Sequence, residues 1–336
     1  MLKKVFLGTL GLVILFTSAI FAAIHLSPWP SAAFVRGMME RDGVAAAEKL
    51  EKHVPSGVTA RLNLHYDAGD DAILDVFYPS SAGVKGAVLP TIVWVHGGGF
   101  VAGSKDEVAS YLKIIAARGF TVVGVNYSLA PRASYPNPIR EVNAALAFLK
   151  GNARRFHIDS SKLFLAGDSA GAQIAAQVAN IISDPSYARQ MGMKPAIQRP
   201  QLKGIILFCG IYDPDQIRLE GAFGGFLRTV GWSYFGRKDF LNDPRMAQFS
   251  VVRHVTADFP PMFISAGNAD PLASHSYALA DIAESEGVPV DRLFFPSDHM
   301  PALSHEYQFN LDTAAGRIAL ERAVQFLSAI EPPPPA

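Results

Sequence analysis

Apolar and polar positions alternate in blocks along most of the chain. From about residue 60, short runs rich in β-branched residues are separated by longer stretches with apolar side chains at helical spacing. The runs predict strands at 61–66, 72–78, 91–95, 121–126, 163–166, 204–208, 261–266 and 291–295. The stretches between them predict helices at about 105–118, 139–150, 170–183, 273–286 and 313–329. Strands that are apolar on both faces and alternate with helices indicate an α/β domain with a mostly parallel sheet, covered on both sides.

Three segments fall outside this alternation. Residues 32–53 show helical spacing before the first strand, and the tail 331–336 is too rich in proline for helix or strand. Residues 211–255 are too long for a simple connection, and they carry the aromatic side chains of Phe223, Phe226, Trp232, Tyr234 and Phe235. A long insertion in a compact domain is typically a lid or a binding segment.

The front of the chain predicts a membrane segment. Residues 5–24 carry no charge, and a helix of that length would span roughly 30 Å, about the thickness of the hydrocarbon core. Lys3 and Lys4 precede it, so the positive-inside rule keeps them in the cytoplasm and exports the rest. The run 27–31, Ser-Pro-Trp-Pro-Ser, would mark the exit from the membrane.

Three interpretations of residues 1–26 remain open. The apolar stretch is long for a cleaved signal peptide and residues 20–23 match a small-x-small cleavage site poorly, so we favour an uncleaved signal anchor. Cleavage and secretion is the alternative, and a buried core helix is the third. With an anchor, the catalytic part would face the periplasm from the inner membrane.

Composition and charge narrow the possible functions. The 336 residues include 30 Lys+Arg and 30 Asp+Glu, with 49% hydrophobic and 18% charged residues, which excludes a disordered chain. A net charge of zero without a basic tract argues against nucleic acid as a partner. The single cysteine, Cys209, excludes an internal disulfide and a Cys-rich metal site. It lies in the apolar run 205–209 and is expected to be a small buried hydrophobe.

The strongest chemical signal is the sequence Gly167-Asp168-Ser169-Ala170-Gly171, between a predicted strand and a predicted helix. This is the G-x-S-x-G nucleophile elbow in its expected context. The glycines allow a sharp turn that exposes the Ser169 hydroxyl above the sheet. Asp168 is expected to support the turn by hydrogen bonding.

A second signal lies upstream at His96-Gly97-Gly98-Gly99, directly after a predicted strand. Consecutive glycines leave backbone N–H groups uncovered by side chains. We expect Gly98 and Gly99, joined by the N–H of Ala170, to form an oxyanion hole.

A serine nucleophile also needs a base and a carboxylate that orients it. Asp270 lies just beyond the predicted strand 261–266, at the expected edge of the sheet. Asp298 is a rival that comes too late to precede a histidine by a βα unit. His299 and His305 both follow the last predicted strand, and the residues alone leave the choice of base open.

These motifs together resemble those of the hormone-sensitive-lipase-like group of α/β-hydrolases, which includes many bacterial carboxylesterases. The resemblance covers roughly residues 60–330 and rests on 96–100 with Gly103, on 167–171, on 270–272, and on the Tyr-Ser-Leu-Ala-Pro segment 127–131. It implies an α/β-hydrolase fold that needs neither a metal nor an organic cofactor. The family places an aromatic residue two positions after its catalytic histidine, which favours His305, followed by Tyr307, although His299 fits the usual spacing from the aspartate.

The resemblance also implies a cap and an activity. The cap would comprise residues 27–58 and the insertion 211–255 of a catalytic domain at 59–330. The expected activity is hydrolysis of short- to medium-chain carboxylic esters, small-molecule substrates, through an acyl-enzyme. A peptidase or amidase on the same scaffold is the alternative. Two further alternatives are a non-catalytic, membrane-tethered binding protein and a subunit of an envelope complex.

Overall fold

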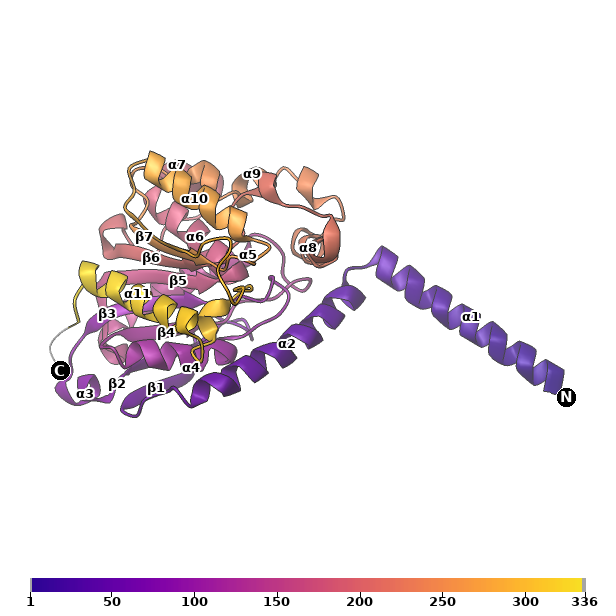
Figure 1. The fold of residues 1–336 in the computed structure, drawn as a ribbon, viewed down its shortest axis with the longest axis horizontal. Helices are drawn as coiled ribbons and strands as arrows, with labels where there is room; N and C mark the ends of the chain where they lie inside the picture. The colour runs from indigo at the N-terminus through magenta and orange to yellow at the C-terminus, as the bar shows by residue number, and fades with distance from the viewer. Residues whose placement is uncertain (1, 334–336) are drawn as a thin grey trace.

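A central eight-stranded sheet organises the computed structural model, which describes residues 2–333 (Figure 1). The strand order is β1-β2-β4-β3-β5-β6-β7-β8; β2 is antiparallel to both of its neighbours, and the other pairs are parallel. The strands are β1 Val58–His65, β2 Ile73–Pro79, β3 Leu89–Val95, β4 Thr121–Val125, β5 Ile158–Asp168, β6 Leu202–Phe208, β7 Met262–Ala266 and β8 Val290–Phe294. Every strand predicted from the sequence is present.

Helices cover both faces of this sheet. Successive residues of β3 enter different cores: Val93 belongs to one cluster of buried side chains and Trp94 to the other. The first cluster includes side chains of α5 Asn137–Gly151, α6 Ser169–Ser183 and α10 Ala273–Ser285; the second includes those of α4 Lys105–Ala116 and α11 Ala314–Ile330. This two-sided burial explains why the strands are apolar on both faces, and the predicted α/β class is confirmed.

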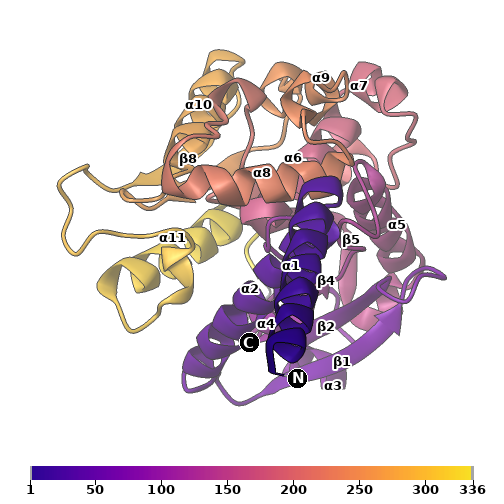
Figure 2. The same ribbon diagram turned by 90° about the vertical axis from the view of Figure 1, so that its right-hand side faces the viewer.

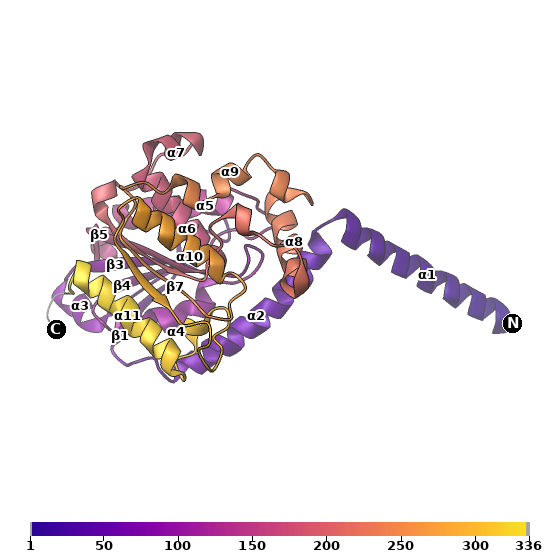
Figure 3. The same cartoon turned by 45° about the horizontal axis from the view of Figure 1, so that its top comes forward.

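Two further helices lie over the edge of the sheet where the parallel strands end: α2 Trp29–Glu51 and α8 Gly221–Phe235 (Figures 2 and 3). Arg36 fixes α2, because its guanidinium donates hydrogen bonds to the carbonyls of Val101, at 2.6 Å, and Ala130, at 2.9 Å. On α8, the Tyr234 ring stacks on Phe100 with a centroid separation of 4.0 Å. Both segments expected to form a cap therefore contribute a helix beside the strand ends.

The remaining helices are short. They are α3 Ser80–Lys85, α7 Pro185–Gln190 and α9 Met246–Phe249, with 3₁₀ turns at Ala153–Phe156, Arg199–Gln201, Pro214–Gln216, Phe240–Asn242, Val252–His254 and Tyr307–Phe309. The segment after α8 is held by the buried amides of α6. Gln173 and Gln177 both donate to the Phe249 carbonyl, at 3.1 and 2.8 Å. The insertion is thus fastened to the helix that follows Ser169.

At the N-terminus, α1 Leu2–Leu26 projects away from the rest of the molecule (Figure 1). Its window Thr9–Leu26 has a mean hydropathy of 2.1 and is 0% buried, so by length and composition this helix could cross a membrane. The interpretation of this segment as a buried core helix is therefore wrong. The predicted break at 27–31 is narrower than expected, because α2 already begins at Trp29 and accommodates Pro30 in its first turn. Residues 331–333 are neither helix nor strand; residues 334–336 of the predicted tail, like Met1, lie outside the described residues.

Candidate active site

The turn between β5 and α6 holds Ser169 in a strained conformation with φ +50°. This turn also brings the backbone of α6 against the end of β3. A Cβ at Gly171 would lie 2.0 Å from the Val95 carbonyl oxygen, and one at Gly167 would lie 2.6 Å from the Gly171 carbonyl carbon. Only glycine fits at either position, which is the physical basis of the elbow motif.

Three side chains from separate loops meet at this turn. The His305 Nε2 atom lies 2.9 Å from the Ser169 Oγ atom, and Nδ1 lies 3.0 Å from each carboxyl oxygen of Asp270. Asp270 follows β7, His305 follows β8, and Asp270 is also held by the Leu272 N–H at 2.8 Å. Nδ1–H therefore donates to Asp270, which leaves Nε2 free to accept the Ser169 proton.

His299, the other candidate base, is not part of this arrangement. Its ring packs against Phe295 at 4.7 Å, and its carbonyl accepts a hydrogen bond from the Asn268 side chain at 3.1 Å. Asn268 also accepts from the Leu303 N–H at 2.8 Å. The turn with His299 thus braces the loop on which His305 lies, and its neighbour Asp298 is exposed.

The loop after β3 has three consecutive residues with positive φ: Gly98 at +107°, Gly99 at +57° and Phe100 at +63°. Within residues 2–333, the N–H groups of Gly98 and Gly99 donate to no protein acceptor. Ala170 lies in the first turn of α6, where an N–H has no intrahelical partner. These three donors are available for an oxyanion.

Asp168 connects the elbow to this loop. Its buried carboxyl accepts hydrogen bonds from the Trp94 indole N–H at 2.7 Å and from the Gly97 N–H at 2.8 Å. Burial, and after it the charge of Glu306, raises the pKa of Asp168 well above its usual range. These hydrogen bonds give Asp168 a supporting position between the elbow and the loop after β3.

His96 shapes the same loop. Its Nδ1 donates to the Gly97 carbonyl at 2.8 Å, and its ring stacks on Tyr127 at 4.4 Å. Burial lowers the pKa of His96 to about 4, so the ring is neutral near pH 7. The Tyr127 hydroxyl donates to the His96 carbonyl at 3.0 Å, which gives the tyrosine of the 127–131 segment a physical role that the sequence did not indicate.

Cys209 lies closer to this centre than the sequence suggested. It follows β6, is buried as predicted, and its sulfur lies within 4.8 Å of ligand atoms of Asp270 and His305. Such a set could hold a metal ion, but burial raises the pKa of the Cys209 thiol to about 11, and Asp270 and His305 already bond to each other. The donor chemistry fits a triad with a neutral thiol beside it.

The electrostatic environment of His305 favours its charged form. Burial lowers the pKa of this imidazole, whereas the Cys209 sulfur, the hydrogen bond to Asp270 and the charge of Glu306 raise it. The net effect raises the pKa of His305 above its usual value. We attribute this rise to the carboxylates of Asp270 and Glu306, because the Cys209 thiol is neutral.

The strand order and the loops that meet at the strand ends define an α/β-hydrolase fold. The chain belongs to the BD-FAE family, whose model matches residues 74–281, more than half of the chain. The resemblance to hormone-sensitive-lipase-like α/β-hydrolases is thereby confirmed.

Several known proteins with similar sequences or folds are esterases by name. An acetyl esterase of Salmonella paratyphi B is 30% identical over 215 residues, which cover 61% of this chain and 63% of that relative's length. Esterase B of Lactobacillus rhamnosis superposes with a TM-score of 0.75 at 21% identity, covering 90% of this chain and 96% of its own. The esterase of Pyrobaculum calidifontis gives 0.70 at 21% identity, covering 89% and 93%. At these identities the two structures show the shared fold.

Replacing Asp168 tests how much the molecule depends on this carboxyl. We expect Asp168→Ala to lower the free energy of unfolding by about 3 kcal/mol, because two buried N–H groups lose their acceptor. Asp168→Asn, which keeps one acceptor oxygen, should cost less. Urea denaturation followed by tryptophan fluorescence measures both, with Asp281→Ala as a control because that carboxylate is 68% exposed. Equal stability of the Asp168→Ala and Asp281→Ala variants would contradict this role.

Proposed function

We propose that this chain is a serine carboxylesterase that hydrolyses short- to medium-chain carboxylic esters through an acyl-enzyme. The observation that carries the proposal is the contact of 2.9 Å between Ser169 Oγ and His305 Nε2, with Asp270 bonded to the far side of the ring. The acetyl esterase relatives support an ester as the substrate. The chain spans 63% of the length of these relatives, so their activity is carried over to it as part of this proposal.

The arrangement of the three side chains allows an ester to acylate Ser169. Ser169 Oγ attacks the ester carbonyl while His305 Nε2 accepts its proton, and Asp270 holds the ring in the tautomer that leaves Nε2 unprotonated. The negative charge that develops on the carbonyl oxygen is stabilised by the N–H groups of Gly98, Gly99 and Ala170. His305 then protonates the departing alcohol, and the C–O bond to the alcohol breaks.

Deacylation uses the same groups. A water molecule gives one proton to His305 and attacks the acyl carbon. The bond between the acyl carbon and Ser169 Oγ then breaks, the carboxylic acid leaves, and the imidazolium returns its proton to Ser169 Oγ. The buried position of Asp270, 6% exposed, keeps its charge from being screened by solvent during both steps.

A small apolar cavity beside the oxyanion loop supports esters with short acyl chains as the substrates. Its room is about 30 Å³, and its lining consists of Phe100, Ile211, Ile217, Leu227, Val230, Gly231, Tyr234, Phe235, Phe240, Met246 and Phe249. Val230 also borders the oxyanion loop, because a Cβ at Gly99 would lie 3.2 Å from it. An acyl chain that leaves the oxyanion hole in this direction meets apolar walls with space for few carbons.

For the N-terminus we propose an uncleaved signal anchor that holds the domain outside the cytoplasm, at the inner membrane. The exposed, apolar window Thr9–Leu26 supports it, as do Lys3 and Lys4 in front of that window. Trp29, 53% exposed, follows directly, at the level where a membrane interface would begin.

The triad assignment predicts a distinct result for each histidine. Ser169→Ala and His305→Ala should each lower kcat/KM for p-nitrophenyl acetate by at least about 10⁴-fold, because each removes a group that forms or breaks a bond. His299→Ala should stay within about twofold, since its ring lies against Phe295. A fully active Ser169→Ala variant would refute the proposal, and faster turnover of aminoacyl arylamides than of esters would favour the peptidase alternative.

The cavity predicts a change of chain-length preference. Leu227→Ala should raise the ratio of kcat/KM for p-nitrophenyl hexanoate over acetate by about tenfold, because the removed side chain opens space for additional methylene groups. Leu62→Ala on β1, where the leucine is 55% exposed, is the matched control. The same ratio in both variants would mean that the acyl chain binds elsewhere.

The anchor predicts an intact, membrane-bound chain. Protein from the membrane fraction should resist a carbonate wash and have an intact mass that includes residues 1–26. A chain that begins at residue 27 should be found in the soluble fraction with unchanged ester hydrolysis, because the α1 window buries no side chain in the domain. A soluble mature protein without these residues would instead support a cleaved signal peptide.

A further inference from the structure

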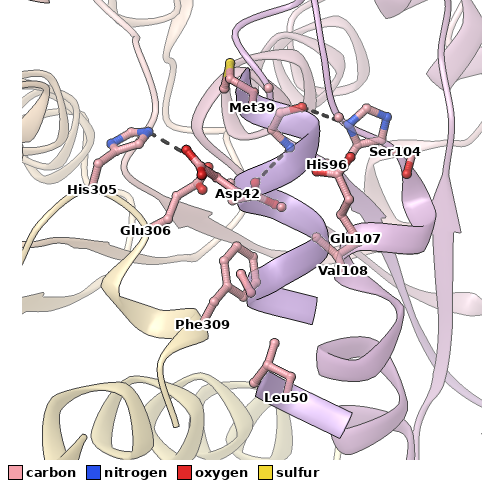
Figure 4. A pocket seen from close by; sticks show the side chains of 16 residues that line it. Met39, Asp42, Leu50, His96, Ser104, Glu107, Val108, His305, Glu306 and Phe309 are labelled. Carbon is pink, nitrogen blue, oxygen red and sulfur yellow. Dashed lines mark hydrogen bonds and ion pairs between the residues drawn. The ribbon is translucent and has the colours of Figure 1, made fainter. Parts of the chain in front are cut away.

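Glu306, the residue directly after His305, adopts an unusual backbone conformation. Its φ is +59°, in the left-handed region that glycine tolerates and glutamate does not favour. Its carboxyl oxygen Oε1 lies 3.9 Å from His305 Nε2 (Figure 4), the ring atom that faces Ser169. Backbone strain of this kind is concentrated at functional sites.

The carboxyl of Glu306 is tied to Asp168. A Cβ at Gly97 would lie 2.4 Å from Asp168 Oδ2 and 2.8 Å from Glu306 Oε1, so the two carboxyls meet over the bare backbone of that glycine. Burial, and after it the charge of Glu306, raise the pKa of Asp168 well above its usual range. The raised pKa favours the protonated form of Asp168, which is the form that can donate a hydrogen bond to the Glu306 carboxyl.

We infer that Glu306 is a positioning residue for the base: anchored on Asp168, its carboxylate faces the Nε2 side of His305 and stabilises the imidazolium that forms when Ser169 gives up its proton. This inference rests on the proposed esterase function. Asp270 acts on the Nδ1 side of the same ring, so His305 lies between two carboxylates. The link to Asp168 also fixes the base loop to the elbow and to the oxyanion loop.

The other charged and titratable groups around Glu306 make the site acidic. A cavity of about 350 Å³ adjoins it, and among the described residues no lysine or arginine lines this cavity. Burial and neighbouring carboxylates raise the pKa of Glu107 on α4 to about 7. The titratable groups that line this cavity or interact electrostatically with Glu306 are Asp42 on α2, His96 after β3, Glu107, Tyr127 after β4, Asp168 on β5 and Cys209 after β6. Asp270, after β7, is bonded to the Nδ1 atom of His305.

The sign of the pH effect follows from the charge. His305 must be neutral to accept a proton, so kcat/KM falls as pH drops through the pKa of its imidazole. Glu306→Gln keeps the size of the side chain and removes the charge, which lowers the pKa of His305 and moves the acid limb of the profile down by about 0.5–1 pH unit. On the alkaline plateau kcat should fall about tenfold with little change in KM, because the imidazolium of the transition state loses a stabilising charge.

The test compares Glu306→Gln with Asp42→Asn, which removes a carboxylate from the same cavity; among the described residues, His305 forms its ion pairs with Asp270 and Glu306 and not with Asp42. We expect the acid limb to move in the first variant alone. Glu306→Asn, a neutral residue that tolerates positive φ, should move it in the same direction and serves if the glutamine variant folds poorly. A profile that keeps its acid limb while kcat falls equally at every pH would show a structural role and overturn the inference.

A direct titration separates this inference from the proposed function. The pKa of the His305 ring can be measured by NMR in the Ser169→Ala chain, with and without Glu306→Gln, and needs no substrate. A lower pKa in the double variant supports the electrostatic role of Glu306, and an equal pKa overturns it. Failure of the unaltered chain to hydrolyse any ester would instead refute the esterase function.

Discussion

The buried carboxyl of Asp168 is the interaction on which the rest of the site depends. It accepts from the Trp94 indole at the end of β3 and from the Gly97 N–H just beyond it. Because β3 and β5 are paired in parallel, with Val95 opposite Gly167, Ser169 and the glycine loop 97–99 leave the sheet side by side. The Asp168 carboxyl thus fixes Ser169 and the loop 97–99 relative to each other. Because this carboxyl is buried, the loss of either hydrogen bond costs free energy of folding.

The position of His305 depends on less regular structure than the position of Ser169. His305 lies on a long loop after β8, and the loop is held at several separate points. Tyr307, two residues on, shares a hydrogen bond of 2.6 Å with Ser265 on β7, and Asn268 braces the turn at His299. Glu306 also connects this loop to the elbow, because its carboxyl and that of Asp168 meet over Gly97. The contacts among Ser169, His305 and Asp270 therefore depend on contacts between loops, each anchored on a strand end.

These two kinds of support explain what the sequence could predict. The strands and the elbow depend on local patterns, namely apolar runs buried on two faces and glycines at positions where a Cβ would collide with backbone. The choice between His299 and His305 depends on how a loop folds back onto Asn268, which no local pattern records. The position of Cys209 beside His305 and that of Glu306 beside Asp168 could not be predicted for the same reason: these neighbours in space come from other strands, far away in the sequence.

The two segments expected to form a cap border both cavities of the candidate site. A Cβ at Gly99 would lie 2.9 Å from Phe226 on α8, so one helix both confines the oxyanion loop and walls the small apolar cavity. On the other side, α2 continues from α1 and is bonded through Arg36 to the Val101 carbonyl of the same loop. Met39, Asp42 and Leu50 of α2 also line the acidic cavity next to His305. The helix α2 is therefore part of the wall of the site, whereas the described side chains of the window Thr9–Leu26 in α1 are not buried.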